Sequence, residues 1–137
     1  MHSVNVNRNR PDFRVFVDLL YGFGRNTDKD GDANPVNSRV WTYLHLADRE
    51  NKDPAVKIHA DDADPSMFSV KSASPRLEEL SALYLFLYCG DSMAVDGVPL
   101  GADAISTLKE KYRVELLRAD GAIWHRSSDD RPYPNLE

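Results

Sequence analysis

SPRLEELSALYLFLYCG, residues 74–90, has the clearest helix signals in the chain. Ser74 can cap a helix that has Pro75 in its first turn, and Gly90 is a natural C-terminal stop. Apolar residues recur at helical spacing and also fill the other sides of the second half, so we expect this helix to be buried nearly all round. The residues predicted to belong to the main core are Leu80, Tyr84 and Leu87.

Three segments before this helix have the composition and alternation of β-strands. They are residues 40–47, 56–59 and 67–71. Further upstream, residues 11–21 repeat apolar side chains with the period of an amphipathic helix. Residues 25–38 collect Asn, Asp, Gly and Pro, a composition typical of a long loop.

The segments after the central helix predict a loop, a second helix and a closing hairpin. Residues 91–101 have a loop composition, and Asp103 can cap a helix. Two strand-like segments, 114–118 and 122–126, flank a turn at 119–121. Clustered strands with clustered helices predict a single-domain α+β fold, with an antiparallel or mixed sheet of about five strands packed on the buried helix.

The two ends of the chain differ in composition from its middle. Residues 1–10 are polar and rich in Asn and Arg, so we expect a flexible N-terminal arm. The α+β domain should span residues 11–131, followed by a polar tail at 132–137. The last two residues, Leu136 and Glu137, resemble a cloning scar before an affinity tag.

Composition excludes several classes of protein. Cys89 is the only cysteine, so no intrachain disulfide can form, and we expect a reducing, cytoplasmic setting. The longest apolar run, 82–89, is much shorter than the about 20 residues that a membrane-spanning helix needs. The net charge of −5 disfavours nucleic-acid binding and favours a basic partner. No membrane partner is expected.

Acidic residues concentrate in residues 28–64, which carry nine acidic and five basic side chains. The run from Asp28 to Asp32, DKDGD, is similar to the first five positions of a calcium-binding EF-hand loop. The resemblance ends there, because Arg39 stands where the closing glutamate should be. A solvated acidic loop explains the same residues, and we expect no metal site and no cofactor.

His59 precedes a second acidic cluster, Asp61, Asp62 and Asp64. A histidine beside carboxylates can bind a divalent metal or act in acid–base catalysis, whereas an acidic turn before a proline explains the same sequence. Cys89 should be a buried structural thiol, and no phosphate-binding glycine loop is present. No coherent set of catalytic residues emerges.

A small acidic domain of this kind resembles bacterial immunity proteins in its general profile, although it carries no motif diagnostic of them. Such proteins neutralise a cognate toxin, often a basic nuclease, through carboxylates and aromatic side chains. The expected binding surface consists of Asp28, Asp30, Asp32, Asp61, Asp62 and Asp64, with Trp41, Tyr43 and Trp124 as aromatic anchors. For both tryptophans, packing in the core is the competing interpretation. Two alternative functions are a metal-dependent hydrolase or nuclease that uses His59, and a self-assembling structural or phage-encoded subunit.

Overall fold

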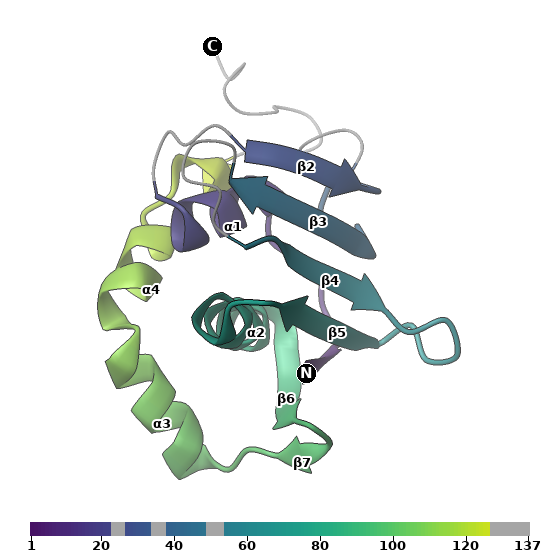
Figure 1. The fold of residues 1–137 in the computed structure, drawn as a ribbon, viewed down its shortest axis with the longest axis vertical. Helices are drawn as coiled ribbons and strands as arrows, with labels where there is room; N and C mark the ends of the chain where they lie inside the picture. Colours follow the sequence, from purple (N-terminus) through teal and green to yellow (C-terminus); the bar gives the residue numbers. More distant parts are fainter. Residues whose placement is uncertain (23–26, 34–37, 49–53, 127–137) are drawn as a thin grey trace.

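A seven-stranded antiparallel sheet with helices packed against it forms a single compact α+β domain (Figure 1). The computed structural model describes residues 1–22, 27–33, 38–48 and 54–126. The strands are β1 (His2–Val6), β2 (Thr27–Gly31), β3 (Tyr43–Asp48), β4 (Val56–Ala60), β5 (Met67–Ser72), β6 (Gly90–Val95) and β7 (Val98–Pro99). The helices are α1 (Phe13–Leu20), α2 (Pro75–Cys89), α3 (Ala102–Lys111) and α4 (Arg113–Asp120), followed by a short 3₁₀ helix at Ile123–Arg126.

The sheet confirms the predicted α+β fold but has more strands than the sequence indicates. The strand order is β2-β3-β4-β5-β1-β6-β7, and every neighbouring pair is antiparallel. The three predicted strands are β3, β4 and β5, which follow one another in the sheet as they do in the chain.

The N-terminal segment is a strand inside the sheet, so the prediction of a flexible arm at residues 1–10 is wrong. β1 pairs with β5 on one side and with β6 on the other. Its alternate residues His2, Val4 and Val6 are buried. The polar residues between them face the other way, and the strand is stable because partners distant in sequence satisfy its hydrogen bonds.

Helix α2 confirms the central sequence prediction. The Ser74 side chain accepts a hydrogen bond from the Leu77 N–H at 3.2 Å, and the helix ends at Cys89. Leu80 and Tyr84 are buried as predicted, but Leu87 is 37% exposed, so its assignment to the main core is wrong. Leu87 faces a groove of about 390 Å³ between α2 on one side and α3 and α4 on the other. Helices α3 and α4 therefore cover this part of α2 only in part.

Gly90 is both the end of α2 and the start of β6. A Cβ atom at this position would lie 2.8 Å from Cγ1 of Val4 and 2.9 Å from Cα of Phe86. Only glycine allows β1 to pass this closely, because real Cβ atoms do not approach heavy atoms to that distance. The prediction of a loop at 91–101 is wrong in part, because this segment contains most of β6 and all of β7.

The predicted closing hairpin is wrong, because residues 113–120 form helix α4. Ala119 is fully buried on this helix. Arg118 donates hydrogen bonds to the carbonyl oxygens of Asp18 and Leu19, at 2.7 and 2.8 Å, and so satisfies the last turn of α1. The glycine after α4, Gly121, is a helix C-cap rather than part of a hairpin turn.

The helix predicted after residues 91–101 is confirmed as α3. It begins at Ala102, and its N-cap is Gly101 and not Asp103 as expected. Helices α1, α2 and α4 group on one side of the sheet (Figure 1). Among the described residues, no helix combines the length and the apolar character needed to cross a membrane. The tail at 132–137 lies outside the described residues.

Candidate binding face

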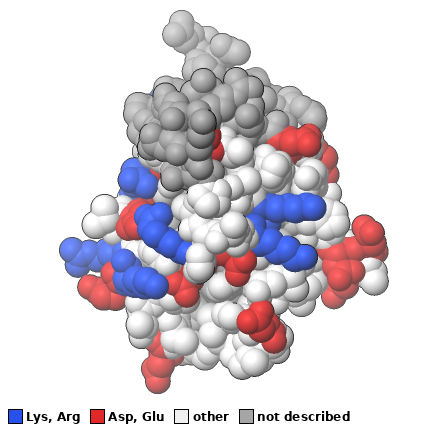
Figure 2. Space-filling view, in the orientation of Figure 1, with Lys and Arg blue, Asp and Glu red and all other residues white. Residues whose placement is uncertain are grey.

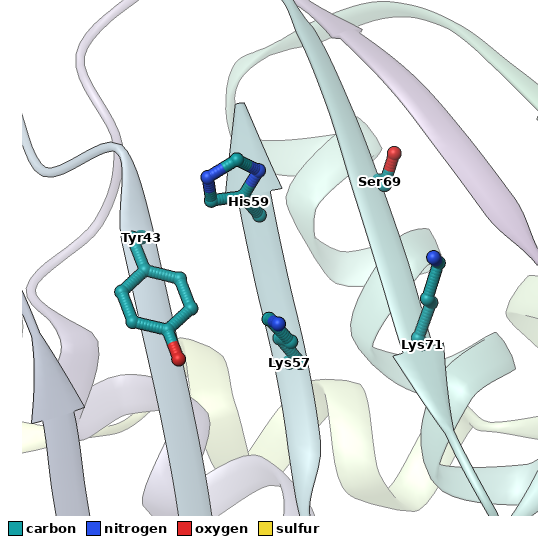
Figure 3. Close-up of a pocket in the computed structure, with 5 residues that line it drawn as sticks. All are labelled: Tyr43, Lys57, His59, Ser69 and Lys71. Atoms are coloured by element: carbon teal, nitrogen blue, oxygen red, sulfur yellow. The ribbon is translucent and has the colours of Figure 1, made fainter. Parts of the chain in front are cut away.

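The sheet has one face against the helices and one face turned away from them. In β4, Val56, Ile58 and Ala60 are buried, whereas Lys57 and His59 are exposed. β3 and β5 alternate in the same way, as expected for strands packed on one side only. We call the second face the open face, and in Figure 3 the helices lie behind it.

Strand register arranges the polar side chains of the open face in two rows. The first row contains Tyr43, His59, Ser69 and Ser3, on β3, β4, β5 and β1. The second row contains Asp30, His45, Lys57 and Lys71, on β2, β3, β4 and β5. Residues directly opposite on antiparallel strands are close enough to interact, so each row is a continuous line of neighbours.

A shallow hollow of about 350 Å³ lies where the two rows cross β3, β4 and β5. Its lining residues, shown in Figure 3, are Tyr43, Lys57, His59, Ser69 and Lys71. The ring centroids of Tyr43 and His59 are 5.6 Å apart, in an edge-to-face arrangement at 77°. Lys57 Nζ lies 5.6 Å from the centroid of the Tyr43 ring. We call this feature the lysine hollow.

The lysine hollow is locally positive although the whole chain is acidic. Lys57 and Lys71 are directly opposite each other on β4 and β5, and neither forms an ion pair with a described residue. Some other cations of the domain do have carboxylate partners, such as Lys111 with Glu79 at 2.9 Å. Like charges placed opposite each other on a sheet are destabilising. An external anion that binds between the two lysines would relieve this repulsion.

The two predicted acidic segments meet at one end of the sheet. Asp32, just after β2, donates its N–H to the carbonyl oxygen of Tyr43 at 3.1 Å. Asp61 follows β4, whose last residue, Ala60, donates to the carbonyl oxygen of Thr42 at 2.9 Å. Asp32 and Asp61 therefore lie beside the start of β3. Acidic side chains gather at the right-hand edge of Figure 2, where the β4–β5 loop lies in Figure 1.

We call this region the acidic end, and define it as Asp30, Asp32, Asp61, Asp62 and Asp64. All five are exposed. Asp28 lies on β2, but its side chain is outside the described residues. The segment 28–31 is an edge strand paired with β3, so the predicted loop at 25–38 is wrong in this part.

Gly31 is what lets β2 run so close to Tyr43. Its φ of +140° disfavours any other residue, and a Cβ atom there would lie 2.1 Å from the Tyr43 carbonyl oxygen. The glycine within the EF-hand-like run DKDGD is thus required by strand pairing.

Asp32 also has a structural task. Its carboxylate accepts hydrogen bonds from the N–H groups of Thr42 and Tyr43, at 2.7 and 3.0 Å, and from the Thr42 hydroxyl. Partial burial works to raise the pKa of Asp32, but these hydrogen bonds outweigh it and hold the pKa below its ordinary value. Asp32 therefore fixes the start of β3 as well as contributing charge.

The carboxylates of the β4–β5 loop divide between turn formation and solvent. Asp61 accepts from the Ala63 N–H at 2.7 Å, and Asp64 accepts from the Ser66 hydroxyl at 2.6 Å. These are local turn bonds of the kind that aspartate commonly forms. Asp62 makes no hydrogen bond or ion pair with a described residue, so its charge points into solvent without a structural task.

Of the three predicted aromatic anchors, only Tyr43 lies on the open face. Trp41 is 1% exposed, donates its ring N–H to the Pro11 carbonyl and packs edge-on against Phe16, so its assignment to a partner surface is wrong. Trp124 is half-buried in the 3₁₀ helix beside α1, with the Arg14 guanidinium 4.2 Å from its ring. Trp124 is therefore remote from the open face.

His59 and the neighbouring aspartates do not form a metal cluster. Within the parts of the chain that the structure describes, no three His, Cys, Asp or Glu side chains lie together as a metal ion would require. His59 instead faces Tyr43 and Ser69, its direct neighbours across the strands. Cys89 is fully buried, donates to the Leu85 carbonyl at 3.4 Å, and burial raises its pKa to about 11.

Lys57, Ser69 and Lys71 were not predicted as site residues from the sequence. Their alternation with buried residues is visible in the sequence and puts them on the outer face of two predicted strands. The signal that was missing is the register, which sets the two lysines opposite each other.

Comparison with known proteins gives no assignment: no family model matches the chain, and no curated protein and no solved structure is significantly similar to it.

Proposed function

We propose that this chain is a non-catalytic binding protein, an immunity protein that neutralises a basic bacterial toxin by direct contact. The observation that carries the proposal is the acidic end, where two segments that are about thirty residues apart in sequence present their carboxylates beside the start of β3. A surface of one sign of charge accelerates encounter with a partner of the opposite sign.

The aromatic pair on the open face supports the same proposal. Tyr43 is half-buried and joins the acidic end to the sheet surface, since its N–H bonds to Asp32 and its ring contacts His59. Binding surfaces typically combine a few aromatic side chains, which supply most of the affinity, with charges that set orientation and rate. A basic nuclease would meet both elements on one face of this domain.

The competing functions make different demands on the same residues. A metal-dependent hydrolase needs ligands around His59, and its turnover would be abolished by His59→Ala. A self-assembling subunit needs a partner surface for its own copies. Neither has an observation in its favour as specific as the meeting of the two acidic segments.

The test is coexpression with the product of the gene directly upstream, because immunity genes commonly follow toxin genes. We expect cells to survive only when this chain is present, and the two proteins to purify as a stoichiometric complex. Survival without a complex, or metal-dependent turnover that His59→Ala removes, would replace the proposal with the hydrolase. A chain that runs as a large homo-oligomer on a sizing column and binds no second protein would favour self-assembly.

A further inference from the structure

The two lysines of the lysine hollow are a feature of the open face that binding to a basic protein does not use. We propose that the hollow is a binding site for the phosphate group of a small organic phosphate monoester. Tyr43 and His59 border both regions, but the charges that would hold a phosphate group are those of Lys57 and Lys71 and not those of the acidic end, so phosphate binding does not rest on the proposed function.

Two cations lie side by side in the lysine hollow. Lys57 and Lys71 are directly opposite each other on neighbouring strands, and no described carboxylate neutralises either of them. Side chains in such positions start from Cβ atoms about 5 Å apart, so both ammonium groups can reach one anion between them. A phosphate monoester has close to two negative charges at neutral pH and matches two cations better than a carboxylate does.

Two further hydrogen-bond donors line the hollow beside the lysines. His59 and Ser69 are also directly opposite each other, two residues along the same two strands from the lysine pair. The four side chains thus form two adjacent cross-strand pairs on one face. A serine hydroxyl and an imidazole N–H can each donate a hydrogen bond, and a phosphate group has three terminal oxygens to accept them.

The size and lining of the hollow suit a small organic ligand. Its volume of about 350 Å³ falls at the lower end of the range of small-molecule sites. Tyr43 lines it beside His59, and so offers an aromatic surface to the organic part of the ligand (Figure 3). An extended nucleic acid is a poor candidate, because its neighbouring phosphates would meet the acidic end, starting with Asp32 beside Tyr43.

Backbone amide NMR with inorganic phosphate and phenyl phosphate as probes tests the proposal, at constant ionic strength set with sodium chloride. We expect saturable shifts centred on residues 43, 57, 59, 69 and 71, with dissociation constants in the millimolar range because the hollow is open to solvent. Phenyl phosphate should bind more tightly than inorganic phosphate, since only the ester can contact the Tyr43 ring.

Two hollow variants and a matched control complete the test. Lys57→Gln and Lys71→Gln should each weaken phenyl phosphate binding about two- to fivefold, the effect of losing one exposed ion pair. Lys109→Gln, an exposed lysine on α3, should leave binding unchanged. Both hollow variants should keep the wild-type melting temperature or exceed it, because each removes a like-charge contact.

The proposal is overturned if the shifts grow linearly and sodium sulfate reproduces them. Equal binding by the hollow variants and by wild type would overturn it as well, as would shifts centred on α3 and α4. None of these results would bear on complex formation with a basic protein, which is measured without phosphate.

Discussion

Tyr43 and His59 lie directly opposite each other on β3 and β4, with their ring centroids 5.6 Å apart and their planes at 77°. This pair stands at the boundary between the acidic end and the lysine hollow. The Tyr43 backbone N–H bonds to Asp32 on one side, and Lys57 Nζ approaches the Tyr43 ring on the other. One tyrosine therefore connects the two charged regions of the open face.

Replacing Tyr43 should affect partner binding more than folding. We expect Tyr43→Ala to cost at most about 1 kcal/mol of stability, because the side chain is only half-buried and loses one cross-strand pair. Its loss from an interface should cost about 2 kcal/mol or more of binding free energy, as for aromatic hot spots. Urea unfolding and titration calorimetry measure the two effects. Tyr43→Phe is the matched control, and equal losses of stability and affinity in Tyr43→Ala would argue against an anchor.

Two leucines of α2 should differ in their contribution to stability. Leu80 is fully buried, so Leu80→Ala should lower the free energy of unfolding by roughly 2–5 kcal/mol through the cavity that it leaves. Leu87 is 37% exposed at the groove beside α3, so Leu87→Ala should cost less than about 1 kcal/mol. Chemical denaturation of both variants measures the two losses of stability. Similar unfolding midpoints would contradict the difference in burial between Leu80 and Leu87.

Cys89 should react only when the domain opens. Burial raises the pKa of its thiol to about 11, so at pH 8 the group is neutral as well as inaccessible, and the thiolate is the reactive form. A thiol reagent added to the native protein at pH 8 should be consumed slowly, at a rate that rises steeply with urea. Rapid modification in buffer alone would show that α2 is not packed as described.

Asp32 should stabilise the domain in a pH-dependent way. Its folded-state pKa is lowered, so the stabilisation is fully present above the ordinary aspartate value and is lost as pH falls through the lowered pKa. We expect Asp32→Ala to cost about 1–2 kcal/mol at pH 7, as for loss of hydrogen bonds to a charged group that remains exposed. The difference from wild type in urea unfolding should shrink below about pH 4. An equal loss at pH 7 and pH 3 would contradict a role for the carboxylate charge.

Local sequence patterns were sufficient wherever an element carries its own signals. Ser74, Pro75 and Gly90 delimit α2, and the alternation in 56–59 identifies β4 with its exposed lysine and histidine. Such elements are specified by caps and by periodicity within the segment itself. The extent of burial is harder to predict from the sequence, because the exposure of Leu87 depends on how far α3 and α4 cover α2.

Local sequence patterns do not predict elements whose stability depends on partners distant in the chain. β1 has a short alternating pattern in a polar context, and its stability comes from β5 and β6, more than sixty residues away. Residues 113–120 fit a strand as well as a helix, and contacts such as Arg118 with the end of α1 favour the helix. The candidate site followed the same rule, since only the register brings Lys57 opposite Lys71.

We propose that the acidic end steers this chain to a basic partner, and the association rate constant measures such steering. The measurement compares two triple variants of equal net charge, binding the upstream gene product at several salt concentrations. Asp61→Asn, Asp62→Asn and Asp64→Asn together neutralise the β4–β5 loop while keeping oxygen acceptors for its turn bonds. The control replaces three exposed acids of α3 and α4, through Asp103→Asn, Glu110→Gln and Asp120→Asn.

We expect the loop variant to associate about tenfold more slowly than wild type at low salt, and the difference to fade as salt rises. The control should associate nearly as fast as wild type, because its charges lie on the opposite side of the domain from the acidic end. Equal association rates for the two triple variants, or a wild-type rate that is independent of salt, would contradict steering by the acidic end.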